Sequence, residues 1–258
     1  MSRAVRRASR GGARSRRTPV RPHGVGRGPR IPWVPLVVLV GIIGVVGIIA
    51  YLIWQQSKPA TQHFEMAARI EADPAPDLPG EFVDLPKIYS GSYGSREGNN
   101  TAQHVSREVD YARDCTDDDP PICNSNPPVG GPHWGAGACP PDPEDATAFC
   151  GPAPWGIYRK PWPAGVLIHN LEHGGVVIWY NITDQQIIEE LEDNITGKVK
   201  DGKILAMAPY PDMEQDTIAL TGWGRIDKFP VSEYTKDRVE DFIDAHLCRF
   251  NPESLPGC

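Results

Sequence analysis

The stretch HNLEHGG places two imidazoles and a carboxylate within five residues. His169, Glu172 and His173 follow the pattern H-x-x-E-H, which in one class of zinc peptidases supplies two metal-binding imidazoles and a glutamate that handles the proton of a water. Those enzymes usually build the pattern on a long helix, whereas Pro163 before it and Gly174 after it leave about two helical turns here. A metal-dependent hydrolase with Glu172 as general base is therefore an alternative, and a metal site without catalysis is preferred.

Two further histidines belong to other segments of the chain. His133 lies in the rigid loop PPVGGPHW, and His104 lies upstream of it. Imidazoles that converge from two or three rigid segments suit copper or zinc. We therefore predict a transition-metal site formed by His169, His173, His133 and His104, with Glu172 as a ligand or as the carboxylate that orients an imidazole.

A plainer interpretation needs no metal, because the histidines could satisfy buried backbone groups in a structural or interaction module. His246 is expected to face a core, since it continues the apolar stripe of a helix, and His63 lies too close to the apolar segment to contribute. Met207 and Met213 would favour Cu(I), but methionine more often fills a core. Ring nitrogens within about 4 Å of a common point would favour the metal site.

Charge is distributed very unevenly along the chain. Residues 1–30 contain ten arginines and no acid, residues 31–54 contain no charge, and the rest holds 16 basic and 33 acidic residues, a formal charge of −17. The apolar run 36–54 is long enough, at about 1.5 Å per residue, to cross a bilayer of roughly 30 Å. It predicts a transmembrane helix whose arginine-rich end stays in the cytoplasm, with a cleaved signal peptide as the alternative.

Composition then suggests a division of the chain into four parts. These are a disordered Arg-rich cytoplasmic tail (1–30), a transmembrane helix (31–54), a Pro-rich stalk (55–86) and an extracytoplasmic globular domain (87–258). The basic tail is suited to anionic lipid at the cytoplasmic leaflet, whereas the acidic domain argues against nucleic acid as a partner.

All six cysteines follow the apolar segment, in a compartment where disulfides persist, so three disulfides are expected. Cys248 with Cys258 is the best single pairing because these two are close in sequence and near the C-terminus. The other four lie in a long loop rich in Pro, Gly and Asp, which they would staple: Cys115, Cys123, Cys139 and Cys150.

Regular structure is predicted mainly after residue 175. Strands are expected at 176–180, 203–207 and 217–223. One helix is expected from Thr183 through Leu191 and a second over 235–247. This order predicts an α+β domain with a small mixed or antiparallel sheet, two helices and the long disulfide-stapled loop.

Four blocks resemble, in this order, the bacterial family named domain of unknown function 3105: NPPVGGPHW, WGIY, VLIHNLEHGGVVIWY and IALTGWGR. The resemblance covers about residues 90–255, and His104-Val105 looks like that family's early His-Val step. Val129 and Gly130 replace the family's usual Thr-Ser, so no role is assigned to those hydroxyls. The resemblance implies that the four histidines and Glu172 form one pattern, that the protein is a single-pass protein of the bacterial cell membrane, and that copper is slightly favoured over zinc. It names no reaction.

Overall fold

The computed structural model describes residues 33–89, 101–106, 108–135, 151–253, 255 and 257–258, with backbone only for 56–64. The chain divides into two compact units, Met1–Ala50 and Tyr51–Cys258.

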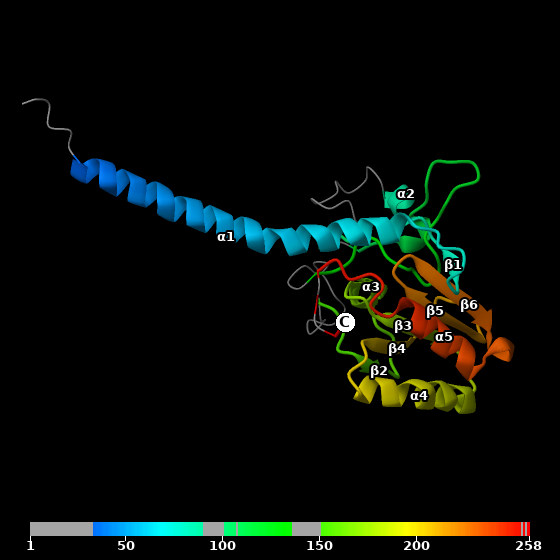
Figure 1. Cartoon of the computed structure of the whole chain (residues 1–258). Coiled ribbons are helices and arrows are strands. Elements are labelled where there is room, and N and C mark those ends of the chain that lie inside the picture. The colour runs from blue at the N-terminus through cyan, green and yellow to red at the C-terminus, as the bar shows by residue number, and fades with distance from the viewer. Residues whose placement is uncertain (1–32, 90–100, 107, 136–150, 254, 256) are drawn as a thin grey trace, which may run out of the picture. The chain divides into compact units, whose positions relative to one another are not determined.

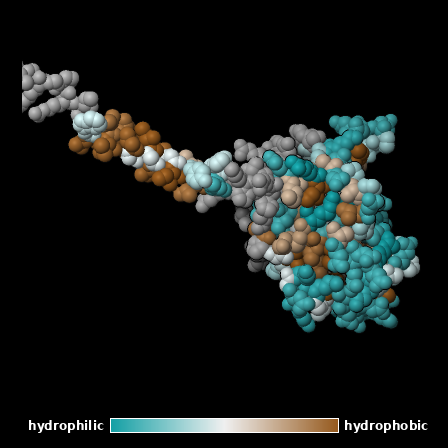
Figure 2. Space-filling model, viewed as in Figure 1, coloured by the Kyte–Doolittle hydropathy of each residue, from teal (hydrophilic) through white to brown (hydrophobic). Residues whose placement is uncertain are grey.

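One long helix, α1 (Trp33–Ala72), contains the apolar segment. Its portion Trp33–Gln55 is long and apolar enough to cross a membrane, and none of it is buried in the protein. Figure 2 shows hydrophobic side chains over this portion. The expected apolar helix is confirmed, and it continues beyond the predicted end at residue 54.

The second unit is built on a six-stranded mixed sheet with the order β1-β6-β5-β3-β4-β2 (Figure 1). The strands pair in parallel between β2, β4 and β3, and antiparallel from β3 through β5 and β6 to β1. Their bounds are β1 (Glu81–Phe82), β2 (Gly156–Ile157), β3 (Val176–Asn181), β4 (Leu205–Pro209), β5 (Thr217–Gly222) and β6 (Arg225–Pro230). The α+β class and the mixed sheet are confirmed.

The central strand β3 separates two hydrophobic cores. Because side chains alternate along a strand, Val177 and Trp179 enter one core while Val176 and Ile178 enter the other. The first core contains α3 and the second contains α4 and α5. The helices of this unit besides the end of α1 are α2 (Leu85–Tyr89), α3 (Ala164–Glu172), α4 (Gln185–Lys200) and α5 (Lys236–His246).

The sequence predicted two helices in the domain, and the structure adds α2 and α3 and moves one boundary. The N-cap of α4 is Asp184 rather than Thr183, because the Asp184 carboxylate accepts a hydrogen bond from the amide of Gln186. The helix continues past Leu191 because buried Ile195 extends its apolar stripe.

Strand β6 was not predicted. Its charged residues, such as Arg225 and Lys228, hide the alternation of a half-buried strand. Its pairing with β5 across a turn at Gly224, which has φ +71°, is a tertiary contact that local pattern does not reveal.

Two disulfides are present among the described residues, Cys115–Cys123 and Cys248–Cys258. The predicted pairing of Cys248 with Cys258 is confirmed. Cys139 and Cys150 lie outside the described residues, so the third expected disulfide stays a prediction.

Part of the segment predicted as a stalk packs within the second unit. At the end of α1, Glu71 is buried and accepts hydrogen bonds from the backbone and hydroxyl of Thr101 and, at 2.8 Å, from the indole of Trp223. The buried Arg225 guanidinium donates to backbone carbonyls between α1 and β1, those of Asp73, Pro74, Ala75 and Gly80.

Candidate metal centre

Helix α3 supplies two of the clustered side chains. It begins after Pro163, whose carbonyl accepts from the amide of Val166, and it ends at a turn where Gly174 has φ +84°. His169 and Glu172 are three residues apart, so they lie on the same face of the helix. Both are buried. The short segment between proline and glycine, where room for about two helical turns was expected, is thus a helix of nine residues.

The loop before His133 packs so closely against α2 that no side chain fits at Gly131. At Gly131, which has φ +105°, an added Cβ would lie 2.5 Å from the ring of Tyr89. The loop is held further by the hydroxyl of Tyr111, which donates to the carbonyl of Pro132 at 2.6 Å. His133 is therefore carried by a rigid backbone, as its proline- and glycine-rich sequence predicted.

Backbone hydrogen bonds bring His104 beside His133. The amide of His133 donates to the carbonyl of Gln103, and the amide of Val105 donates to the carbonyl of His133, each at 2.8 Å. The two histidines thus form an isolated parallel bridge. The backbone at Gly135 also lies close to the ring of His104, because an added Cβ there would lie 2.5 Å from the Cγ atom of His104.

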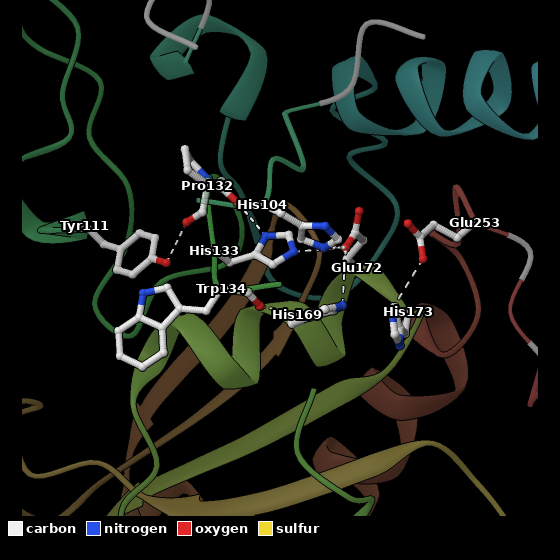
Figure 3. A network of polar contacts seen from close by, with 10 residues as sticks. His104, Tyr111, Pro132, His133, Trp134, His169, Glu172, His173 and Glu253 are labelled. Carbon is white, nitrogen blue, oxygen red and sulfur yellow. Dashed lines mark hydrogen bonds and ion pairs between the residues drawn. The ribbon is translucent and has the colours of Figure 1, made fainter. Parts of the chain in front are cut away.

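Three imidazole nitrogens converge on one carboxylate oxygen (Figure 3). The Oε2 atom of Glu172 lies 2.9 Å from Nε2 of His133, 3.3 Å from Nε2 of His104 and 3.9 Å from Nε2 of His169. One ligand atom from each of these four residues lies within 4.8 Å of every other. Segments far apart in the sequence thus present their donors to one small volume.

In two of the imidazole rings, the second nitrogen, Nδ1, is hydrogen-bonded to a backbone carbonyl group. Nδ1 of His133 lies 2.8 Å from the carbonyl oxygen of Gly131, and Nδ1 of His169 lies 2.7 Å from that of Trp134. A carbonyl oxygen only accepts, so each Nδ1 carries the proton and donates. In a neutral ring, Nε2 is then unprotonated and its lone pair points toward Glu172.

Burial and charge set the ionisation of the cluster. Burial lowers the pKa of His169 from 6.5 to about 3, and the nearby His133 acts in the same direction. Burial alone would raise the pKa of Glu172, but its contacts with His104 and His133 outweigh burial and hold that pKa below its ordinary value. At neutral pH the site therefore combines a carboxylate with a neutral His169.

The donor separations suit a shared cation. Two ligand atoms about 2.0–2.1 Å from a tetrahedral Zn²⁺ lie about 3.4 Å apart. The separations of 2.9, 3.3 and 3.9 Å around Oε2 of Glu172 bracket that value. The donor set, three imidazoles and one carboxylate, is also one that zinc and Cu(II) accept.

His173 lies outside this group of four. Its ring is in edge contact with that of His169, with centroids 4.6 Å apart, but its Nε2 lies 3.6 Å from Oε2 of Glu253. His173 is the C-cap of α3, and the residue after it contacts the C-terminal segment, since the carbonyl of Gly174 accepts from the amide of Cys248 at 2.7 Å. Glu253 was not predicted from the sequence, because its contact with His173 joins residues 80 positions apart.

The other candidates are placed as expected or lie outside the description. His246 is buried on α5 and its Nε2 bonds the carbonyl of Pro79 at 2.8 Å, which confirms the expected core position. Met207 and Met213 are buried in the two hydrophobic cores, which confirms their interpretation as core residues. His63 falls among the residues whose side chains are not described.

The fold and the cluster define an α+β domain with a site of three histidines and a glutamate, of which all but His104 are buried. Residues 149–256 match the family described as "Protein of unknown function (DUF3105)", which supports the resemblance noted in the sequence. The match includes His169, Glu172 and His173, whereas His104 and His133 precede it. No curated protein and no solved structure matches the chain.

Proposed function

We propose that the domain binds a transition-metal cation, zinc or copper, through the Nε2 atoms of His104, His133 and His169 and the carboxylate of Glu172. The observation that carries the proposal is the convergence of three Nε2 atoms on one carboxylate oxygen, while two of the rings donate their Nδ1 protons to carbonyls. Fixing the far side of a ligand imidazole in this way is typical of metal sites.

Electrostatics supports a cation at this position. The lone pair of an unprotonated Nε2 and a carboxylate oxygen repel each other unless a positive group lies between them. Protons on Nε2 could serve these contacts one at a time, for example the 2.9 Å contact from His133 to Glu172. A metal ion attracts all four donors at once.

The donor types favour Zn²⁺ or Cu²⁺ over Cu⁺. Cu⁺ prefers thiolate and thioether sulfur. The cysteines of the two described disulfides are not available as thiolates, and Met207 and Met213 are packed in the cores. Nitrogen and oxygen donors remain, which zinc and Cu²⁺ both accept.

The arrangement favours binding over the hydrolase alternative. In the H-x-x-E-H scheme His169 and His173 would hold the metal and Glu172 would face a water. Here Oε2 of Glu172 lies among the imidazole nitrogens, which is a ligand position, and His173 is directed to Glu253. The metal-free alternative accounts for the carbonyl contacts of Nδ1 and for the contacts of His133 and His104 with Glu172. A metal ion would in addition engage His169, whose Nε2 lies 3.9 Å from the same oxygen.

The proposed setting is the bacterial cell membrane, crossed once by the first part of α1. The N-terminal tail (1–30) would lie in the cytoplasm beside anionic lipid and the domain (87–258) outside. An apolar stretch over Trp33–Gln55, ten arginines before it and disulfides after it support this topology.

Elemental analysis tests the proposal. The full-length chain is purified in detergent without a histidine tag, from a metal-replete medium, together with a His104→Ala/His169→Ala double variant and a His246→Gln control. We expect about one equivalent of zinc or copper in the wild type and the control, and loss of the metal in a double variant that keeps its circular dichroism spectrum. A wild type that holds no metal even after reconstitution would reject the proposal.

A further inference from the structure

His173 and Glu253 form a second pair of metal-type donors beside the buried cluster. We propose that this pair is an outer cation site through which the metal ion reaches and leaves the inner centre. The inference rests on the function proposed above and adds to it a route for the ion. The pair comprises the C-cap residue of α3 and a residue of the C-terminal segment.

The outer pair is more exposed than three of the four inner residues. The side chains of His133, His169 and Glu172 are 0, 5 and 5% exposed, whereas those of His173 and Glu253 are 18 and 34% exposed. The fourth inner side chain, that of His104, is 27% exposed. A hydrated cation can therefore meet the outer pair while it keeps water ligands. It could not approach His169 or Glu172 as freely.

The geometry of the outer pair suits a shared cation better than a direct hydrogen bond. Nε2 of His173 and Oε2 of Glu253 are 3.6 Å apart. Hydrogen bonds between nitrogen and oxygen are typically about 2.7–3.2 Å long, whereas two ligands of one tetrahedral metal ion are about 3.4 Å apart. Two ligands from the protein and several waters would hold an ion weakly, as a transfer site requires.

The pair is also continuous with the inner centre. The rings of His173 and His169 are in edge contact with centroids 4.6 Å apart, and His169 is itself a member of the buried cluster. An ion can thus exchange His173 for His169 as a ligand over a few ångströms, and lose its remaining waters as the inner donors replace them. No change in oxidation state is needed.

The position of Glu253 is fixed by the C-terminal disulfide. Cys248 and Cys258 close a loop that contains Glu253, and the amide of Cys248 donates to the carbonyl of Gly174 at 2.7 Å, next to His173. A Cβ at Gly174 would lie 3.0 Å from both the Cys258 sulfur and the Phe250 carbonyl oxygen. The loop is therefore pressed on the end of α3, which keeps Glu253 facing His173.

The kinetics of Zn²⁺ exchange distinguish a transfer site from an inner ligand. Zn²⁺ loading of the full-length metal-free chain, and its release to a chromogenic chelator, are followed by stopped flow for the wild type, Glu253→Gln and His173→Gln. Glu214→Gln, which removes an exposed carboxylate paired with Lys228 elsewhere, is the matched control. Glu253→Gln changes one charge on a partly exposed side chain and keeps its shape, so folding should be preserved.

We expect loading and release to slow by the same factor, roughly tenfold, in both variants, with unchanged stoichiometry and Kd. The equal factor follows because a site on the route lowers the barrier in both directions without changing the end state. Unchanged rates in both variants, or a weaker Kd with one of the two rates unaffected, would overturn the transfer site while leaving the inner metal centre intact. A wild type that binds no Zn²⁺ or copper would overturn both proposals.

Discussion

Nε2 of His133 lies 2.9 Å from the Oε2 atom of Glu172, while Nδ1 of the same ring lies 2.8 Å from the carbonyl oxygen of Gly131. The imidazole is thus fixed from both sides, by a backbone acceptor and by a carboxylate. Glu172 occupies the centre of the cluster, since it is the residue that all three imidazoles contact.

The substitution Glu172→Gln should abolish tight metal binding. The amide keeps the shape of the side chain but removes the negative charge that offsets the charge of the metal ion, so we expect Kd to rise by at least about 100-fold. Competition titrations against a chelator of known affinity measure the change. Glu214→Gln serves as the control, and a Kd within threefold of the wild type for Glu172→Gln would show that Glu172 is not a ligand.

The substitution Gly131→Ala should destabilise the fold and weaken the metal site together. The added methyl group would lie 2.5 Å from the Tyr89 ring, at φ +105°, so the loop that carries His133 must move. We expect a loss of about 2–4 kcal/mol in the free energy of unfolding, measured by urea denaturation of the metal-free protein.

The matched control for that experiment is Gly197→Ala in α4. Its added Cβ meets nothing within 4 Å, and the helix favours alanine, so the same change should stabilise the protein by about 0.5–1 kcal/mol. Equal effects at the two glycines would contradict the tight packing of the His133 loop.

Protonation of His246 should contribute to acid destabilisation. Burial lowers the pKa of His246 from 6.5 to about 4 although its bond to the carbonyl of Pro79 opposes the shift. Below pH 6.5 the unfolded chain binds a proton that the folded chain refuses, so this contribution to stability is complete above pH 6.5 and is lost as the pH falls toward 4.

The lost stability should reach about 2 kcal/mol at pH 5. Urea denaturation of metal-free wild type and His246→Gln between pH 7.5 and 5 measures it, since glutamine can still donate to the Pro79 carbonyl. The variant should show a shallower decline with falling pH. Parallel pH profiles would mean that His246 is not the group responsible.

Replacement of Arg225 should loosen the connection between α1 and β1. Its guanidinium donates to the carbonyls of residues 73–75 and of Gly80, and Arg225→Met leaves those acceptors without that partner. We expect a loss of about 3 kcal/mol in the free energy of unfolding and faster amide hydrogen exchange at residues 73–83. Unchanged exchange in this segment would contradict the role of the guanidinium.

Much of the fold followed from local sequence patterns. The apolar run predicted the long helix, and the β-branched and aromatic residues of 176–180 predicted the central strand. The final helix was predicted to within one residue at each end, because Thr235 caps it and its apolar stripe is regular. Strand β6 and helix α3 were less visible, since a charged strand and a nine-residue helix between proline and glycine carry weak periodic signals.

By itself, the sequence determined which side chains could bind a metal and on which stiff segments they lie. It indicated His104, His133, His169, Glu172 and His173, because imidazoles and a carboxylate beside glycine and proline are chemically distinctive. It could not separate the four residues that converge from the one that faces outward. Local spacing fixes neighbours along a helix, but not which way the chain turns after it.

Only the tertiary structure showed which four of these residues converge and that His173 faces Glu253 instead. The bridge between His104 and His133, the carbonyl partners of two rings and the contact of His173 with Glu253 all join residues distant in sequence. Such contacts depend on how the sheet, α3 and the disulfide-closed C-terminal loop pack together. The direction of each nitrogen lone pair, which decides between a metal site and a set of polar side chains, is set by that packing.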